Sequence, residues 1–281
     1  MEIVRIPKVM QETSKGHILH GRSIGFVPTM GALHEGHLSL VRVSRQENDI
    51  TVVSIFVNPM QFGPSEDYNQ YPRDFEGDME KLRREGVDIL FLPDKDHMYP
   101  EGFSTNIEVS NLSHKLCGAF RPGHFRGVAT VVTKLFNIVI PTRAYFGQKD
   151  YQQSLIIKRL VRDLDMNIDI VICPTVREED GLAMSSRNLY LSEKERTAAT
   201  VLYRALQAGY GAIKAGVTKK EEITKIMRDI VESEPLVSEI QYLSVYDPDD
   251  LEELEVINKR ALLAGAIKIG KTRLIDNIVN P

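Results

Sequence analysis

The sequence predicts an α/β fold: a Rossmann-like parallel sheet with helices on both faces, plus a smaller C-terminal α+β domain. Apolar, strand-like runs alternate with helical patterns from Met1 to about Pro174, which is typical of a parallel sheet covered by helices. The run at residues 50–57 is β-branched and apolar on both faces, as a central parallel strand should be. Beyond Ser192, helical patterns precede strand-like runs, which indicates a separate α+β unit.

The individual elements follow from periodicity and from the residues that start and stop them. Asp74 is a suitable N-cap for a helix that ends at Gly86, and Ser192 and Glu195 have the spacing of a capping box. The expected strands are 23–28, 50–57, 87–92, 144–146, 168–172, 240–245, 261–269 and 272–278. The expected helices are 38–45, 74–85, 128–139, 151–164, one long helix over about 192–214, and 218–232.

Two domains are expected, with the boundary in a charged, turn-like segment around residues 174–181. Residues 1–175 form the predicted Rossmann-like domain for nucleotide and substrate, and residues 176–281 form the predicted C-terminal α+β domain. The second domain carries the segment Met184-Ser185-Ser186-Arg187, so we expect it to act as a lid.

Composition excludes several classes of protein. The 281 residues include 35 Lys and Arg against 39 Asp and Glu, a net charge of −4, which argues against a nucleic-acid partner. Cys117 and Cys173 have no metal-site spacing and are expected to be reduced thiols. No signal-peptide pattern opens the chain, and no apolar stretch approaches the ~20 residues of a membrane span, so we expect a cytoplasmic protein without a membrane partner.

The first candidate site is the turn at residues 30–37, between an apolar strand and a predicted helix. Glycines there allow an anion close approach to backbone N–H groups, and His34 and His37 project to nearly the same side. This predicts a phosphate site with imidazoles aimed into it. The alternative is that the histidines only cap the helix, and zinc binding is disfavoured by their spacing of three.

The second candidate site follows the most strand-like segment of the chain. Asn58 and Gln61 are amides at a strand's carboxyl end, suited to hold hydroxyls or a carboxylate, although the same residues could form an ordinary turn. The polar and aromatic loop at residues 67–73 is a candidate wall or lid.

The third candidate site lies at another strand-to-helix turn. Lys149 could place an ammonium on a nucleotide phosphate, with Asp150 available for a metal ion, or it could be an ordinary surface lysine. Gln153, early in the following helix, would face the same side.

The fourth candidate site is Met184-Ser185-Ser186-Arg187, whose hydroxyls and guanidinium could close over a triphosphate or could be ordinary surface groups. Arg121, His124 and Arg126 add positive charge before another helix, either for an anionic substrate or for an interface. No nucleophile elbow, dinucleotide-binding motif or Walker A motif is present in the sequence.

The motifs together resemble a known family. The segment at 30–37, with its His-x-Gly-His core, resembles the first signature of the HIGH-type nucleotidyltransferases, and 184–187 resembles their second, KMSKS-type signature. The segments at 28–37, 56–62, 146–150 and 180–188 all resemble the pantoate–β-alanine ligase (pantothenate synthetase) family, in the same order and over essentially the full chain.

This resemblance implies a ligase that condenses (R)-pantoate with β-alanine to pantothenate, through a pantoyl adenylate, with ATP as substrate, Mg²⁺ assisting, and AMP and pyrophosphate released. It implies pantoate and β-alanine contacts at Asn58, Gln61 and Gln153, a metal contact at Asp150, and a homodimer. The implied catalytic residues are His34, His37, Lys149, Ser185 and Arg187. The implied ATP residues are Met30, Gly31, Ala32, Leu33, His34, Glu35, Gly36, His37, Gly147, Gln148, Lys149, Asp150, Val176, Met184, Ser185, Ser186 and Arg187.

Two other functions remain open at this point. A related nucleotidyltransferase with another small-molecule acceptor is disfavoured because Gln61 and Gln153 are amides, whereas a phosphorylated substrate would favour cations. A non-catalytic nucleotide- or RNA-binding module is disfavoured by the net charge of −4.

Overall fold

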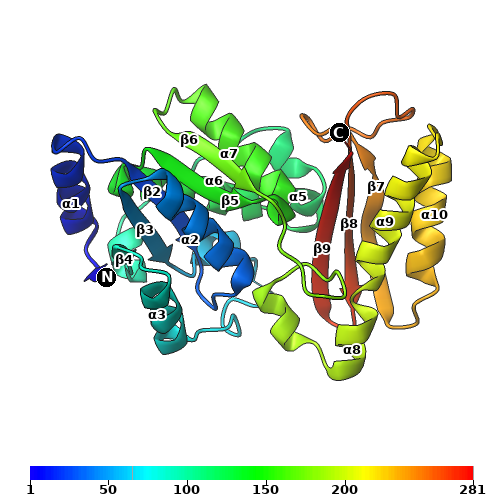
Figure 1. Cartoon of the computed structure of the whole chain (residues 1–281), viewed down its shortest axis with the longest axis horizontal. Coiled ribbons are helices and arrows are strands. Elements are labelled where there is room, and N and C mark those ends of the chain that lie inside the picture. Colours follow the sequence, from blue (N-terminus) through cyan, green and yellow to red (C-terminus); the bar gives the residue numbers. More distant parts are fainter. Residues whose placement is uncertain (65, 281) are drawn as a thin grey trace. The chain divides into compact units, whose positions relative to one another are not determined.

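The computed structural model describes residues 1–64 and 66–280 of the chain. The chain divides into two compact units. The first contains Met1–His114, Arg121–Gly147 and Gln153–Pro174, and the second contains Lys115–Phe120, Gln148–Gln152 and Thr175–Pro281. Figure 1 shows the sheet of the first unit in blue to green and the sheet of the second unit in orange to red.

The elements have the following bounds. The strands are β1 (Glu2–Val4), β2 (Ile24–Thr29), β3 (Ile50–Ile55), β4 (Ile89–Phe91), β5 (Arg143–Gly147), β6 (Asp169–Cys173), β7 (Val237–Tyr246), β8 (Ala261–Ile269) and β9 (Thr272–Asn280). The α-helices are α1 (Pro7–Leu19), α2 (Glu35–Glu47), α3 (Phe75–Arg84), α4 (Lys95–Met98), α5 (Cys117–Phe120), α6 (His124–Val139), α7 (Tyr151–Asp163), α8 (Glu193–Ala198), α9 (Val201–Lys214) and α10 (Lys220–Glu232). The 3₁₀ helices are η1 (Pro59–Gln61), η2 (Leu112–His114), η3 (Gln148–Asp150) and η4 (Ser186–Tyr190).

The sheet of the first unit is parallel throughout, with the strand order β1-β4-β3-β2-β5-β6. From β2 the chain adds β3 and then β4 on one side, and it later returns to add β5 and β6 on the other. The direction of winding therefore reverses beside β2. In open α/β sheets this switch point, at the carboxyl ends of the strands, is where ligands bind.

Helices cover both faces of this sheet, so neighbouring residues of one strand, which point to opposite sides, pack on different helices. On one face, Phe26 and Phe146 each lie 6.4 Å, centroid to centroid, from the ring of Phe136 in α6. On the other face, Val27 and Tyr145 pack in one buried cluster with residues of α2 and α3. The predicted Rossmann-like architecture is confirmed.

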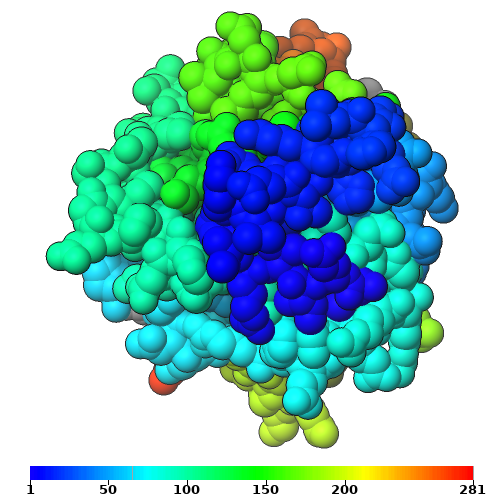
Figure 2. All heavy atoms as spheres, turned by 90° about the vertical axis from the view of Figure 1, so that its left-hand side faces the viewer, coloured from blue at the N-terminus to red at the C-terminus, as the bar shows by residue number. Residues whose placement is uncertain are grey.

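The N-terminal elements β1 and α1 were not predicted by the sequence. The strand β1 has only 3 residues, too few to establish an alternating pattern. Helix α1 packs on α6 and β2 but buries only Met10 and Ser14 along its length, so its apolar stripe is weak. Figure 2 shows this blue N-terminal segment spread over the surface of the first unit.

The second unit contains an antiparallel sheet in the order β7-β8-β9. Helix α9 packs on β8 and β9, and α10 packs on α9 and β7, so the sheet and the helices enclose one apolar core. The predicted smaller α+β unit is thereby confirmed as a class of fold.

The long helix predicted over 192–214 is wrong, because α8 ends at Ala198 and α9 begins at Val201. The capping box of Ser192 and Glu195 is present. At the interruption, Ala199 and Thr200 keep right-handed helical backbone angles, and the Thr200 hydroxyl donates to Thr197 O at 3.0 Å.

The described residues contain no helix with the length and apolar character needed to span a membrane. Cys117 and Cys173 are both buried and free.

Candidate active site

The turn after β2 has a left-handed backbone that a buried carboxylate holds. Gly31 has φ 84° and Ala32 has φ 49°, and glycine reaches this region far more easily than alanine does. The carboxylate of Asp78, in α3, accepts hydrogen bonds from Ala32 N at 2.8 Å and Leu33 N at 2.7 Å. Lys81 Nζ donates to Leu33 O at 2.8 Å. The conformation of the turn therefore depends on α3 as well as on its own glycine.

Asp78 is itself a buried acidic side chain with partners on both of its oxygens. Its side chain is 2% exposed, and Lys81 Nζ lies 3.9 Å from the carboxylate. Burial raises the pKa of Asp78, and the hydrogen bonds from Leu33 and Ala32 oppose this shift. A buried carboxylate without such donors would be costly, so the carboxylate and the turn stabilise each other.

The two histidines open helix α2. His34 is the N-cap, and its backbone N–H donates to His37 Nδ1 at 3.3 Å. The two ring centroids lie 4.1 Å apart. Both histidines therefore take part in capping α2, and the phosphate contact of their rings stays a prediction. Because Nδ1 of His37 accepts this bond, the neutral ring carries its hydrogen on Nε2, a donor located at the positive end of the helix dipole.

The amides predicted for a substrate form a buried network around η1. Asn58 Nδ2 donates to Gln61 Oε1 and to Gly127 O, each at 3.1 Å, and Tyr99 OH donates to Asn58 Oδ1 at 2.7 Å. Gln61 Nε2 lies 3.1 Å from Met30 Sδ. The structure therefore brings together three residues that the sequence singles out: Met30, Asn58 and Gln61.

A chain of polar contacts also holds the main chain at Gln61. His124 Nδ1 donates to Gln61 O at 2.8 Å, and Arg121 Nη1 donates to His124 Nε2 at 3.0 Å. Arg121 Nη2 pairs with Glu66 Oε2 at 2.6 Å. Burial raises the pKa of Glu66, but the hydrogen bond and charge of Arg121 outweigh it and lower that pKa. The sequence offered Arg121 either for an anionic substrate or for an interface, and in the structure its guanidinium pairs with Glu66 of the same unit.

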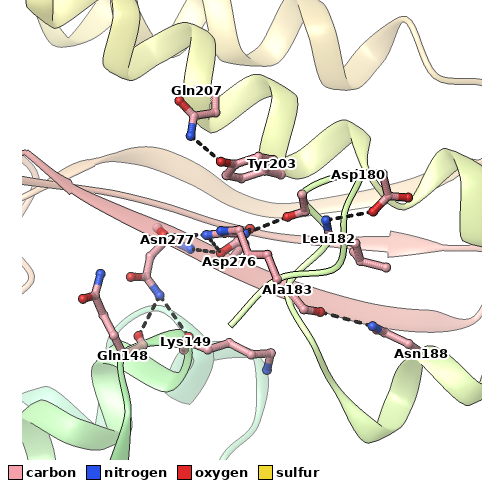
Figure 3. Close-up of polar contacts among 12 residues, drawn as sticks. Gln148, Lys149, Asp180, Leu182, Ala183, Asn188, Tyr203, Gln207, Asp276 and Asn277 are labelled. Atoms are coloured by element: carbon pink, nitrogen blue, oxygen red, sulfur yellow. Dashed lines mark hydrogen bonds and ion pairs between the residues drawn. The ribbon is translucent and has the colours of Figure 1, made fainter. Parts of the chain in front are cut away.

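The lysine turn is held in the second unit. Lys149 Nζ lies 3.5 Å from Asp150 Oδ1. Asn277 Nδ2, in β9, donates to Gln148 O at 3.0 Å and to Lys149 O at 2.9 Å, as Figure 3 shows. Gln153 lies near the start of α7 and is half-buried.

The segment that contains Met184-Ser185-Ser186-Arg187 is folded back on itself. Met184 N donates to Val176 O at 3.0 Å. Ser185 caps η4, its hydroxyl oxygen accepting from Arg187 N at 3.3 Å. Thus the structure places Val176 beside Met184 and places Ser185 beside Arg187, within the second unit.

Comparison with known proteins decides the family. A sequence model of the family described as Pantoate-beta-alanine ligase matches residues 2–279. The chain belongs to this ligase family. The pantothenate synthetase of Thermodesulfovibrio yellowstonii is 61% identical over 279 residues, which are 99% of each chain. That of Caldicellulosiruptor bescii is 54% identical over 279 residues, again 99% of each chain.

Solved structures of pantoate–β-alanine ligases have the same fold. The pantothenate synthetase of Thermus thermophilus has a TM-score of 0.94 and 47% identity, with 99% of both chains covered. A ligase of Francisella tularensis, solved in complex with β,γ-ATP and β-alanine, has a TM-score of 0.82 and 38% identity, with 99% of this chain and 97% of that chain covered.

In this member of the pantoate–β-alanine ligase family, several residues that hold the predicted site were not found from the sequence. They are Asp78, Tyr99, Asp276 and Asn277. One signal was available for Asp78, which shares the buried side of α3 with Leu82. A charged residue on an apolar stripe is unusual and indicates a buried partner.

Proposed function

We propose that the chain catalyses the ATP-dependent condensation of (R)-pantoate with β-alanine to pantothenate, with a pantoyl adenylate as intermediate. The observation that carries this proposal is the match of residues 2–279 to the ligase family. It is supported by the Francisella tularensis relative, which was solved with β,γ-ATP and β-alanine. The turn at the end of β2, at the switch point of a parallel sheet, agrees with a nucleotide substrate.

In the first step, a carboxylate oxygen of pantoate attacks the α-phosphorus of ATP. A P–O bond forms, the bond to the β-phosphate breaks, and pyrophosphate leaves. We assign His34, His37, Lys149, Ser185 and Arg187 as donors to the phosphates, because charge that develops on phosphate oxygens is stabilised by fixed N–H and cationic groups. His37 Nε2–H is such a donor.

We propose that ATP is bound by two groups of residues. The first group is the turn at the end of β2 and the start of α2, that is Met30, Gly31, Ala32, Leu33, His34, Glu35, Gly36 and His37. The second group consists of Gly147, Gln148, Lys149, Asp150, Val176, Met184, Ser185, Ser186 and Arg187. The second group includes the phosphate donors Lys149, Ser185 and Arg187.

In the second step, the amine of β-alanine attacks the acyl carbon of the adenylate. The C–N bond forms, the C–O bond to AMP breaks, and the proton that the amine loses passes to water. We propose that Gln61 and Gln153 hold pantoate, that Gln61 also contacts β-alanine, and that Asn58 orients Gln61 through its 3.1 Å hydrogen bond. Catalysis of this kind is chiefly positioning, so no covalent nucleophile is needed.

We propose that Mg²⁺ accompanies ATP. Within the described part of the chain, no three His, Cys, Asp or Glu side chains are grouped so as to hold a metal ion. Asp150 supplies a single carboxylate with 46% of its side chain exposed. These residues fit Mg²⁺ bound mainly by substrate phosphates and water, with at most one protein carboxylate. Bound there, the ion would neutralise phosphate charge.

Four further expectations, on domain organisation, assembly and location, stay predictions. They are a boundary between residues 175 and 176, a lid role for residues 176–281, a homodimer, and a cytoplasmic location.

A pyrophosphate-release assay tests the proposed function. With ATP and pantoate alone, we expect one burst of pyrophosphate about equal to the enzyme concentration, because the adenylate remains bound. Adding β-alanine should give continuous turnover, with AMP and pantothenate formed in equal amounts. ATP with β-alanine alone should release none. Pyrophosphate release that never requires pantoate would favour a nucleotidyltransferase with another acceptor, and no release under any condition would favour a non-catalytic binding module.

A further inference from the structure

Two neighbouring residues of β9 hold two of the segments that we propose for ATP. Asp276 and Asn277 are 5% and 3% exposed. Successive residues of a strand point to opposite faces of the sheet, so this pair can serve both sides of β9. In Figure 3 the two residues lie between the segment that contains Leu182 and the turn at Gln148 and Lys149.

Asp276 holds the segment that leads to Met184 through an arginine. Arg177 Nη1 donates to Asp276 Oδ2 at 2.6 Å, and Nη2 donates to Asp276 Oδ1 at 2.9 Å. The same guanidinium donates to Gly181 O at 3.0 Å and lies 4.0 Å from the ring centroid of Tyr203. The backbone of Arg177 also pairs with that of Ala183 in an isolated antiparallel β-bridge. The ion pair with Asp276 therefore acts on the hairpin of residues 177–183, which precedes Met184.

Asn277 holds the lysine turn on its other side. Both hydrogens of its side-chain amide are used, because Nδ2 donates to the carbonyls of Gln148 and Lys149. These carbonyls belong to η3, from which the Lys149 side chain extends. An aspartate at position 277 would have nearly the same shape. It would place a carboxylate against two carbonyl oxygens and supply no donor.

The stability of the core does not explain the buried ion pair of Asp276 with Arg177. Leu274 and Ile278 flank Asp276 on the same face of β9, and both pack in the apolar core of the second unit. Replacing a buried ion pair by apolar side chains of similar volume is often neutral or stabilising. The ion pair is therefore better explained by its effect on the position of the segment before Met184 than by a contribution to the free energy of unfolding.

We infer that Asp276 and Asn277 are positioning residues for ATP, Asp276 acting on Val176–Arg187 through Arg177 and Asn277 acting on the Lys149 turn. This inference rests on the proposed role of those two segments in binding ATP. A single strand of a rigid sheet then serves as the common reference for both segments. A fixed reference matters because phosphate donors must stay within a fraction of an ångström of their places.

The experiment compares ATP binding in four purified full-length variants with the unchanged protein. Asn277→Asp and Asp276→Asn each perturb one side of β9. The double variant Arg177→Met/Asp276→Leu removes both charges of the pair and keeps the interior apolar. Glu239→Gln is the matched control, because it removes an exposed ion pair, that with Lys268, from the same sheet.

The readouts are the dissociation constant for ATP with Mg²⁺ by calorimetry, the KM values for ATP and β-alanine, and the melting temperature. We expect Asn277→Asp and Asp276→Asn each to weaken ATP binding about tenfold. The first variant loses two hydrogen bonds to main-chain carbonyls, and the second weakens the charged hydrogen bonds with Arg177. The double variant should weaken it similarly while melting near the unchanged protein. The KM for β-alanine should stay the same in all four variants, and Glu239→Gln should match the unchanged protein throughout.

A purely structural role predicts a different pattern: lower melting temperatures and a smaller active fraction, with the dissociation constant for ATP unchanged. Unchanged ATP binding in the folded double variant and in Asn277→Asp would overturn the inference, even if the unchanged protein makes pantothenate. Failure of the unchanged protein to make pantothenate would overturn the proposed function instead. The calorimetric comparison does not depend on turnover, so it would still decide the inference.

Discussion

Replacing Asp78 by alanine should destabilise the turn that carries the proposed ATP residues. In the structure the carboxylate accepts two hydrogen bonds, at 2.8 Å from Ala32 N and at 2.7 Å from Leu33 N. Ala32 and Leu33 are both buried, so water cannot replace the lost acceptor without a local opening of the turn. Each buried N–H left without an acceptor costs about 1–3 kcal/mol.

The loss is partly offset, because the variant no longer buries a charge. Burial raises the pKa of Asp78, which shows that the ionised form is a cost in the folded state. Summing the two orphaned donors and subtracting this relief gives a net loss of roughly 3 kcal/mol in the free energy of unfolding. For a unit of this size, that corresponds to a melting temperature lower by about 6–12 °C.

The assay is urea denaturation near pH 7, combined with the rate of pantothenate formation. Two controls are matched to the change. Asp78→Asn keeps one acceptor and should fall between the unchanged protein and Asp78→Ala. Glu80→Ala lies on the same helix in an exposed pair with Arg84 and should cost no more than about 0.5 kcal/mol.

Activity should fall by about tenfold or more in Asp78→Ala, because His34 follows the turn directly and small displacements of donors are expensive in rate. An Asp78→Ala protein within about 0.5 kcal/mol of the unchanged protein, judged against the scatter of surface substitutions, would refute this reasoning. It would mean that the turn keeps its left-handed backbone without the carboxylate.

Three further outcomes are expected. His37→Ala should lower kcat by about 10²-fold or more with an unchanged melting temperature, as the loss of a transition-state donor does; turnover like that of the unchanged protein would contradict its role. Gly127→Ala should raise the KM for pantoate, because the new Cβ would lie 2.2 Å from Met60 O and displace the amide network; an unchanged KM would contradict this. Glu66→Gln should lose the stability that comes from the pair with Arg121. Since the pKa of Glu66 is lowered in the folded state, that stability is complete above about pH 4.3 and is lost as the pH falls through the folded pKa. Urea curves of both proteins at pH 7 and pH 3 should therefore differ most at pH 7.

The class of fold could be predicted from the sequence because it depends on local patterns. The apolar, β-branched run around Val52 and Val53 matches a strand buried on both faces, and both residues are fully buried in β3. The elements that were missed or misplaced have weak local signals. Helix α1 buries little of its length, and the break before Val201 lies within an otherwise continuous helical pattern.

The candidate site was partly predictable for a related reason. Its motifs lie where strands turn into helices, and residues there such as Gly36, Asn58 and Lys149 have no role in the apolar pattern and therefore stand out. What the sequence could not show is which distant side chain holds each loop. Asp78 reaches the turn across 46 residues of chain, and Asn277 reaches Lys149 across 128. No local period relates such pairs, so only the folded chain reveals them.

The residues that hold the segments of the candidate site share one physical property, by which such residues can be found in other proteins. Asp78, Asn58 and Asp276 are polar side chains that are 5% exposed or less, in positions where an apolar residue would be the ordinary choice. Asp78 bonds to the backbone of a turn, Asp276 bonds to an arginine, and Asn58 bonds to the side chains of Gln61 and Tyr99 and to the main chain of α6. A buried polar group is costly unless it is paired, so its presence implies a partner that the chain needs in a fixed place. The turn at Ala32 has a positive φ at a residue other than glycine, which is a strained conformation. The hydrogen bond from Ala32 N to the carboxylate of Asp78 compensates for this strain, and without it the turn would relax to another conformation.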